Sequence, residues 1–416
     1  MAAPVRVRFL GGVDEVGHLG MVLEGQRTKL LFDYGMAPRD PPEYPAPAPN
    51  DLEALFLTHS HLDHSGMVPA IAGSQGIPIV GTSLTRTMSD LLAYDSMKVA
   101  RLEGYPQPFK REGIAAMNAQ WDERHYGDTR ESGEFDVRLH AAGHIPGSTM
   151  FEADDGSTRL LFTGDINLID THLVKKAEPV RCDVLAIEAT YSGREHPDRT
   201  VTEEQLLDAV SGVVAQGGRV ILPCFAVGRT QEMMCILANQ GYDVWVDGMG
   251  KTVLQMMLED NRYLRSPREL QKAMEGVTLV KNPAQREKAS QAEVIITTSG
   301  MLDGGPALHY LSTMRTDPRS AVFFTGYQVP GSGGRSLLDT GALDLGKGKV
   351  EKVECEIRHF DFSGHAGHSE IVQFAKRCQP EHVVLYHSDD RSVLAKDLGE
   401  FAKVHTPMTG EDVELS

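Results

Sequence analysis

Nine residues, THSHLDHSG at positions 58–66, carry the strongest signal in this sequence of 416 residues. They contain His59, His61, Asp63 and His64, and they begin where an apolar run typical of a β-strand, ALFLTH, ends. Residues packed this densely cannot share one face of a helix, but on a tight loop they can surround metal ions. Imidazole nitrogens suit zinc, and a carboxylate in the same cluster can serve a second ion. The competing interpretation, a polar loop with scattered histidines, requires four ligand-type residues to meet by chance.

Two later segments supply what this loop lacks. His144, in AAGHIPGS, follows a predicted strand and is flanked by a glycine and a proline, which force a turn. Asp165, in LLFTGDIN, stands at the end of another predicted strand. Either residue alone would be interpreted as structural, but a two-metal site needs a third histidine and a bridging carboxylate. Asp33, at the strand end in LLFDYG, is predicted to orient a ligand histidine rather than to bind metal itself.

The pattern of predicted secondary structure changes along the chain. Up to about residue 194, short β-rich runs alternate with glycine turns, interrupted by a proline-dense loop at 40–50 and a predicted helix at 84–100. Helices and strands then alternate regularly, and the apolar runs VILPCF and VIITT are typical of parallel strands covered on both faces. After residue 347 the strand-rich pattern of the first region returns. We therefore predict an α/β protein in which residues 195–345 form a domain inserted into a first domain made of residues 1–194 and 346–416.

Composition limits the classes of function. The formal net charge of −17 is unusual for a protein that contacts nucleic-acid phosphates. Bound divalent metals would, however, supply strong positive charge locally. The five cysteines are an odd number and form no CxxC pair, so we expect them to be reduced, as in the cytoplasm. The sequence has no signal-peptide pattern and no run near the roughly 20 apolar residues that span a bilayer, so we expect no membrane association.

Taken in order, Asp33, the HxHxDH loop, His144 and Asp165 resemble the motifs of the metallo-β-lactamase superfamily, which implies an αββα sandwich. Three further segments resemble those of its β-CASP branch of nucleic-acid nucleases: LAIEATY with Glu188, FDFSGHAGH with His365, and VVLYHS with His387. The segment between them resembles the inserted parallel α/β β-CASP domain. Its phrases ILPCFAVGRTQEM, TTSGMLDGGP and FFTGYQVPGSGGRSLL are similar to those of the cleavage-and-polyadenylation-specificity-factor nucleases, their archaeal relatives and the RNase J group.

The resemblance implies a role for each matched residue. Two sets of three ligands, joined by a bridging Asp165, would hold two zinc ions: His59, His61 and His144 for one, and Asp63, His64 and His387 for the other. His365 would protonate the leaving oxygen, with Glu188 holding its ring. A histidine at position 387 points to RNA, because DNA-directed members usually have valine there. This chain departs from its relatives in following that histidine with Ser388 and Asp389 instead of glycine and glutamate.

The activity implied is zinc-dependent hydrolysis of phosphodiester bonds in single-stranded RNA, in RNA 3′-end processing or decay. The residues leave endonuclease and 5′–3′ exonuclease action both open. Backbone groups of a glycine-rich loop can cradle phosphate, and substrate binding is predicted for Ser299, Gly331, Gly333, Gly334 and Arg335. Family analogy also suggests a homodimer. Two alternatives are a small-molecule ester or thioester hydrolase of the same superfamily, and a non-catalytic scaffold subunit of a processing complex.

Overall fold

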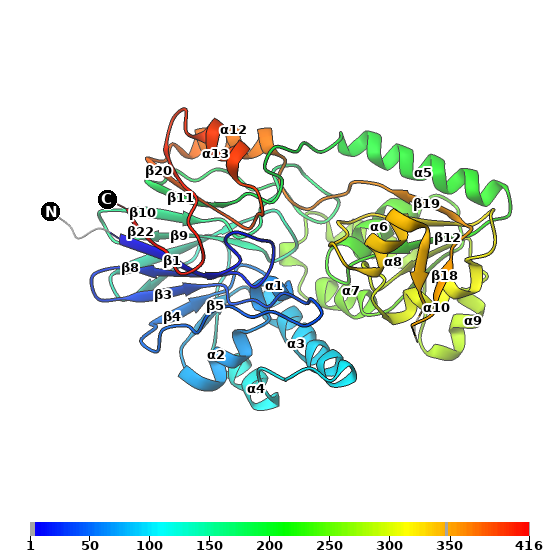
Figure 1. The fold of residues 1–416 in the computed structure, drawn as a ribbon, viewed down its shortest axis with the longest axis horizontal. Helices are drawn as coiled ribbons and strands as arrows, with labels where there is room; N and C mark the ends of the chain where they lie inside the picture. Colours follow the sequence, from blue (N-terminus) through cyan, green and yellow to red (C-terminus); the bar gives the residue numbers. More distant parts are fainter. Residues whose placement is uncertain (1–4, 346–347, 416) are drawn as a thin grey trace. The chain divides into compact units, whose positions relative to one another are not determined.

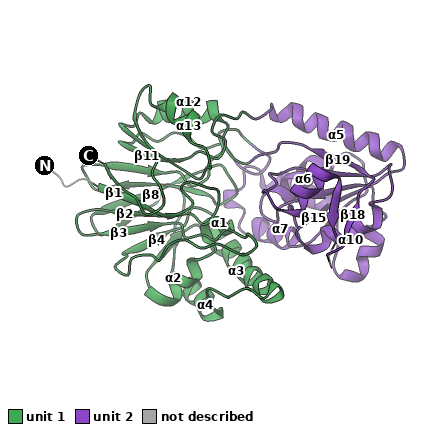
Figure 2. Ribbon diagram, viewed as in Figure 1, with its two compact units in different colours: residues 1–170, 175–195, 364–416 green, residues 171–174, 196–363 purple. Residues whose placement is uncertain are grey.

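A computed structural model describes residues 5–345 and 348–415 (Figure 1). The chain divides into two compact units, coloured separately in Figure 2. The first unit comprises the residues up to 170, residues 175–195, and the residues from 364 onward. The second comprises residues 171–174 and 196–363. Within the described residues, no helix combines the length and apolar character needed to cross a membrane.

The first unit contains two seven-stranded sheets. One has the order β22 (Asp412–Leu415), β1 (Val5–Gly11), β2 (Gly20–Glu24), β3 (Lys29–Phe32), β4 (Ala54–Phe56), β5 (Ile79–Gly81) and β6 (Trp121–Glu123). The other has the order β21 (Lys403–His405), β20 (His382–Tyr386), β11 (Val184–Glu188), β10 (Arg159–Phe162), β9 (Thr149–Asp154), β8 (Phe135–Ala141) and β7 (Thr129–Ser132). Both sheets are mixed, and β3 to β6 as well as β10, β11, β20 and β21 run parallel.

The two sheets pack face to face around an aromatic core. The rings of Phe32 and Phe162, one from each sheet, have centroids 5.3 Å apart, and the Phe162 ring stacks on that of Tyr386 at 5.2 Å. Alternate residues of the same strands point to the opposite face, as Leu31 and Leu161 do. Both faces are therefore buried, which explains why these strands are almost continuously apolar.

Helices cover the outer face of each sheet (Figure 1). The first sheet packs on α2 (Val68–Gln75), α3 (Ser83–Glu103) and α4 (Arg111–Ala119). The second packs on α12 (His368–Cys378) and α13 (Ser392–Leu398). The first unit is thus an αββα sandwich, as predicted.

The second unit is built on a six-stranded, all-parallel sheet. Its order is β14 (Thr278–Leu279), β13 (Val244–Asp247), β15 (Val294–Thr297), β12 (Val220–Pro223), β16 (Ala321–Phe324) and β19 (Glu356–His359). Its helices are α5 (Arg199–Ala215), α6 (Arg229–Leu237), α7 (Gly250–Glu259), α8 (Pro267–Glu275), α9 (Arg286–Ala289), α10 (Gly305–Met314) and α11 (Gly333–Thr340), and a two-stranded sheet pairs β17 (Ala342–Asp344) with β18 (Val350–Lys352). The unit extends past the boundary predicted at residue 345, to residue 363, because β19 pairs with β16.

Candidate metal centre

The parallel strands of the first unit bring the sequence motifs to one edge of the sandwich. In the second sheet, Asp165 follows β10, Glu188 ends β11 and His387 follows β20. In the first sheet, Asp33 follows β3 and the histidine loop follows β4, its parallel neighbour. Because parallel strands present their carboxyl ends at the same edge, segments far apart in the sequence meet there.

The 58–66 motif is not entirely a loop. Asp63 and His64 lie in α1 (Leu62–Ser65), a single helical turn for which His61 is the N-cap residue. The backbone N–H groups of His64 and Ser65 both donate to the carbonyl of His61, at 3.0 and 2.8 Å. His59 and His61 precede this turn, whereas Asp63 and His64 lie within it, and the motif supplies ligands to two neighbouring groups.

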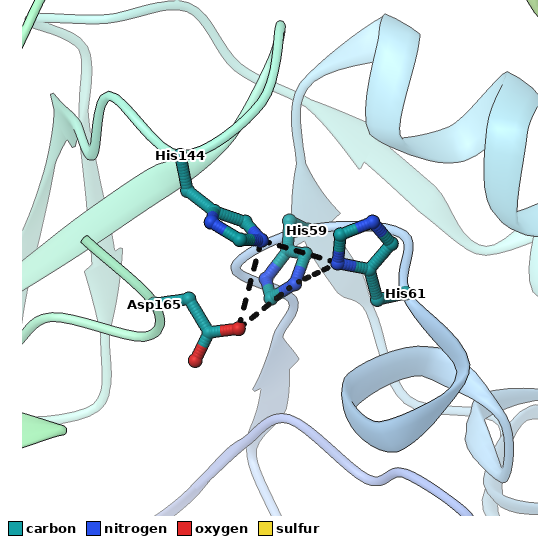
Figure 3. Close-up of side chains that lie close together, drawn as sticks. All are labelled: His59, His61, His144 and Asp165. Atoms are coloured by element: carbon teal, nitrogen blue, oxygen red, sulfur yellow. Dashed lines mark hydrogen bonds and ion pairs between the residues drawn. The ribbon is translucent and has the colours of Figure 1, made fainter. Parts of the chain in front are cut away.

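The first group consists of His59, His61, His144 and Asp165, whose ligand atoms all lie within 4.8 Å of one another (Figure 3). The Nδ1 atom of His61 lies 3.1 Å from Nε2 of both His59 and His144. Oδ2 of Asp165 lies 3.5 Å from the first of these Nε2 atoms and 3.6 Å from the second. Three imidazole nitrogens and one carboxylate oxygen therefore converge on one point.

The second group consists of Asp63, His64 and His387. Oδ2 of Asp63 lies 3.5 Å from Nε2 of His387 and 3.8 Å from Nε2 of His64. Asp165 also reaches this group, because its Oδ2 lies 3.3 Å from Nε2 of His64 and its Oδ1 lies 3.6 Å from Nδ1 of His387. One carboxylate is therefore shared by both groups, which is the arrangement expected of a two-metal centre.

The residues fit metal ions by a second criterion. Nε2 of His64, Nε2 of His387 and Oδ1 of Asp165 are buried and have no hydrogen-bond partner. Buried polar atoms in proteins almost always have such a partner, so three unpartnered atoms in one cluster mark a place where ligand bonds are to be made. Nitrogen and carboxylate donors of this kind suit zinc and related transition metals.

Hydrogen bonds behind the ligands fix the orientation of the imidazoles. Nδ1 of His64 lies 2.8 Å from the Asp33 carboxylate, which also accepts from the backbone N–H and hydroxyl of Thr58 at 2.8 Å. Nδ1 of His144 donates to the carbonyl of Gly364 at 2.8 Å. Asp33 thus contacts a predicted ligand histidine, and its orienting role stays a prediction. Such contacts select the tautomer that leaves the other nitrogen available to a metal.

The electrostatics of the two groups differ. Burial lowers the pKa of His59 and of His144 well below the ordinary histidine value, with help from the neighbouring imidazoles, so both are neutral and able to coordinate. Burial opposes protonation of His64 too, but the carboxylates of Asp165, Asp63 and Asp33 outweigh it and raise its pKa well above the ordinary value. A metal ion that binds at His64 must therefore displace a proton.

A third cluster adjoins the shared carboxylate. The His365 ring is held through Nδ1 by both oxygens of the fully buried Glu188, at 2.9 and 3.0 Å, and its Nε2 lies 4.0 Å from Oδ2 of Asp165. Burial alone would lower the pKa of His365, but Glu188 and Asp165 raise it to about 9. The imidazole therefore carries a proton at neutral pH and is 21% exposed, so it can deliver that proton to a substrate.

Thr190 is a member of this site that the sequence analysis missed. Its hydroxyl donates to Glu188 and lies 3.2 Å from Nδ1 of His387, so it links the two. A lone threonine carries no metal-ligand or acid–base signal. The only clue available was its position two residues after Glu188.

The predicted substrate-binding residues lie in the second unit, where much of their hydrogen bonding is internal. The N–H groups of Gly333 and Gly334 donate to Asp303 and to the carbonyl of Met301, both at 2.7 Å. Arg335 is ion-paired with Asp339, one helical turn away. A Cβ atom at position 334 would lie 1.8 Å from a side-chain oxygen, so packing accounts for that glycine. Gly331 has a positive φ of 89°, and Ser299 follows β15. Phosphate binding by this loop stays a prediction.

Family models match three parts of the chain. Residues 13–219 match the metallo-beta-lactamase superfamily, 230–337 the Beta-Casp domain, and 350–407 the Zn-dependent metallo-hydrolase RNA specificity domain. A solved structure of a protein of unknown function from Enterococcus faecalis has the same fold, with a TM-score of 0.64 and 16% identity over 99% of this chain and 100% of that one.

Curated archaeal relatives match almost the whole length of this chain. A "Probable RNase MJ4" of Methanocaldococcus jannaschii is 32% identical over 99% of this chain and 100% of its own length. An "RNase aCSPSF2" of Saccharolobus solfataricus is 33% identical over 98% and 85%. A "Transcription termination factor FttA" of M. jannaschii is 31% identical over 94% and 68%.

The αββα sandwich and its histidine–aspartate clusters at the strand ends define a metallo-hydrolase with a metal-binding site. The chain belongs to the Beta-Casp branch of the metallo-beta-lactamase superfamily, together with these archaeal proteins.

Proposed function

We propose that this chain is a two-zinc ribonuclease that hydrolyses phosphodiester bonds of single-stranded RNA. The observation that carries the proposal is the position of the Glu188-held His365 beside Asp165, the carboxylate shared by both ligand groups. A metal centre alone would serve many hydrolases, but a protonated imidazole next to it suits a reaction whose leaving group is an alkoxide. The relatives named as ribonucleases agree with this chemistry.

One zinc would be held by His59, His61 and His144, the other by Asp63, His64 and His387, with Asp165 between them. When bound, the two ions would supply Lewis acidity, which activates water and neutralises charge on the phosphate. The histidine ligands keep their free nitrogens aimed inward through Asp33 and Gly364. His365 transfers its Nε2 proton to the 3′ oxygen as the phosphorus–oxygen bond breaks, while Glu188 stabilises the imidazolium. The products carry a 5′-phosphate and a 3′-hydroxyl.

The test compares the wild type with His64→Ala and His365→Ala on 5′-labelled and 3′-labelled single-stranded RNA, with DNA of matching sequence alongside. His309→Ala, which removes an exposed histidine of α10, is the matched control. We expect both site variants to lose RNA cleavage, but only His64→Ala to lose bound zinc. The two label positions separate endonuclease from 5′–3′ exonuclease action.

A wild type that holds two zinc ions but leaves RNA and DNA intact would refute the ribonuclease proposal and favour a small-molecule esterase or thioesterase. A protein that holds no zinc would favour a scaffold subunit instead. The homodimer and the cytoplasmic location stay predictions. Light scattering of the purified chain tests the first of these.

A further inference from the structure

The segment that follows Glu188 places an aromatic ring next to His365 and a guanidinium on that ring. The Tyr191 ring centroid lies 6.1 Å from that of His365, and Cζ of Arg194 lies 4.7 Å from the Tyr191 centroid. Nη2 of Arg194 also donates to the carbonyl of Thr190 at 2.6 Å. A cation–π contact and a hydrogen bond together hold the guanidinium in place. It is linked to His365, the predicted proton donor, through the Tyr191 ring.

The backbone around Arg194 is anchored. The N–H of Gly193 donates to Nδ1 of His368 at 3.1 Å, and the N–H of His368 donates to the carbonyl of Arg194 at 2.9 Å. Both contacts lie at the start of α12, the helix that His365 precedes. The loop that carries Arg194 and the loop that carries His365 are therefore fixed to each other.

The charge of Arg194 is not neutralised within the part of the chain that the structure describes. Among the described residues, no carboxylate oxygen lies within 4.0 Å of the Arg194 guanidinium. The side chain is also exposed. The neighbouring Glu195 is engaged elsewhere, because its Oε1 accepts from the backbone N–H of Ser369 at 3.0 Å and from the Ser369 hydroxyl. Arg39 and Arg159, by contrast, pair with carboxylates at 2.7 and 3.0 Å. In a chain of net charge −17, an exposed and oriented cation beside the site suits an anionic ligand.

We propose that Arg194, held on Tyr191, binds the phosphate that directly precedes the scissile phosphate on its 5′ side. This inference rests on the proposed function, in which His365 protonates the 3′ oxygen of the nucleotide on that side. Tyr191 is the neighbour of His365 and carries the Arg194 guanidinium, so the guanidinium lies on the side of that nucleotide. Its fork matches two oxygens of the nucleotide's phosphate. The site thereby favours a strand of linked phosphates over an isolated phosphodiester.

The first experiment measures kcat/KM at several salt concentrations for an RNA with one cleavage site. Arg194→Ala should lower kcat/KM about 10-fold, since hydrogen bonds to charged groups contribute on that scale. It should also reduce the slope of log(kcat/KM) against log[salt] by about 0.7, the value for one phosphate contact on a single strand. Arg181→Ala is the matched control, because Arg181 is also exposed but precedes β11, at the end opposite Glu188. It should change neither quantity.

The second experiment locates the contact. Single phosphates of the same RNA are replaced, one at a time, by uncharged methylphosphonates. In the wild type, replacing the phosphate 5′ to the scissile one should cost about 10-fold. In Arg194→Ala the same replacement should cost nothing further, because the two changes remove one interaction. Arg194→Lys, which keeps the charge without the fork, should retain the salt slope.

Zinc content and thermal midpoint are measured for each variant, so that a folding defect is recognised. If Arg194→Ala loses zinc or stability, Arg194→Lys and the methylphosphonate series decide in its place. Additive losses, coupling to a different phosphate or an unchanged salt slope would each overturn the assignment while leaving the ribonuclease proposal intact. A wild type that does not cleave RNA would refute both the ribonuclease proposal and the role of Arg194.

Discussion

Replacing Asp33 with asparagine isolates one hydrogen bond on which the proposed metal centre depends. The Asp33 carboxylate is fully buried and accepts from Thr58 twice, from its N–H and its hydroxyl, and from Nδ1–H of His64, each at 2.8 Å. An ionised carboxylate can only accept hydrogen bonds. It therefore keeps a proton on Nδ1 of His64, so that the proton a metal displaces is the one on Nε2.

Asparagine has nearly the same shape but carries a donor at one end. If its amide nitrogen faces His64, it donates to Nδ1 and moves the ring proton to Nε2, which can then no longer bind a metal. If the amide is turned round, its nitrogen meets the backbone N–H of Thr58 instead. Either orientation breaks one bond of a buried group, which costs about 1–3 kcal/mol of folding free energy. Lost orienting contacts of this kind weaken metal affinity about 10–100-fold.

The assay titrates metal-free Asp33→Asn with zinc against a chromophoric chelator and counts bound zinc by mass spectrometry. We expect one site near the wild-type affinity and one weakened about 10–100-fold. Asp51→Asn serves as the control, because Asp51 is exposed and pairs only with Lys29 among the described residues. Two zinc sites of wild-type affinity in Asp33→Asn would refute the orienting role of Asp33.

Three further predictions concern other parts of the molecule. The His172 ring donates hydrogen bonds to Glu203 and Glu269, which raise its pKa to about 9, above the unfolded value of about 6.5. This stabilisation is complete below about pH 6.5 and is lost as the pH rises through about 9. Urea unfolding of the wild type should therefore show that its free energy of unfolding falls by about 1–2 kcal/mol over that pH range, after allowance for solvent screening. His172→Gln should not show this fall, and equal pH profiles for the two proteins would contradict the prediction. Thr190→Val should lower kcat about 10-fold with zinc retained, because Glu188 and His387 lose a shared partner. Thr190→Ser should keep a kcat near that of the wild type. Equal rates for the two variants would argue against a positioning role for Thr190. Glu232→Gln should reduce the free energy of unfolding by about 3–5 kcal/mol, because Glu232 is the buried partner of both Arg199 and Arg229. A change under about 1 kcal/mol in a denaturant titration would show that the two arginines find other partners.

The sequence indicated where the candidate site forms because the chemically informative residues stand at strand ends. The HxHxDH loop and Asp165 each follow an apolar run that forms a strand with a parallel neighbour, and parallel strands bring such ends together whatever their separation along the chain. The αββα fold with a Beta-Casp insertion was predictable because these motifs resemble those of the family. The second boundary was not, because the strand run at 355–360 has the style of the first unit but pairs with β16 of the second. Pairing between distant strands leaves no local pattern.

The supporting atoms of the site were less predictable than its ligand-type residues. Gly364 orients His144 through a backbone carbonyl, which every residue possesses. Thr190 acts through a hydroxyl that nothing in the sequence distinguishes from other threonines. The glycine-rich loop shows the opposite case. Its pattern is typical of phosphate binding, but the N–H groups of Gly333 and Gly334 are hydrogen-bonded within the protein.

Adding zinc to the metal-free protein while following cleavage of 5′-labelled single-stranded RNA tests most directly whether a two-metal centre performs RNA hydrolysis. Cleavage should rise with added zinc and reach a plateau at two equivalents per chain, one for each ligand group that shares Asp165. Full cleavage by the metal-free protein, or intact RNA in the presence of two bound zinc ions, would contradict it.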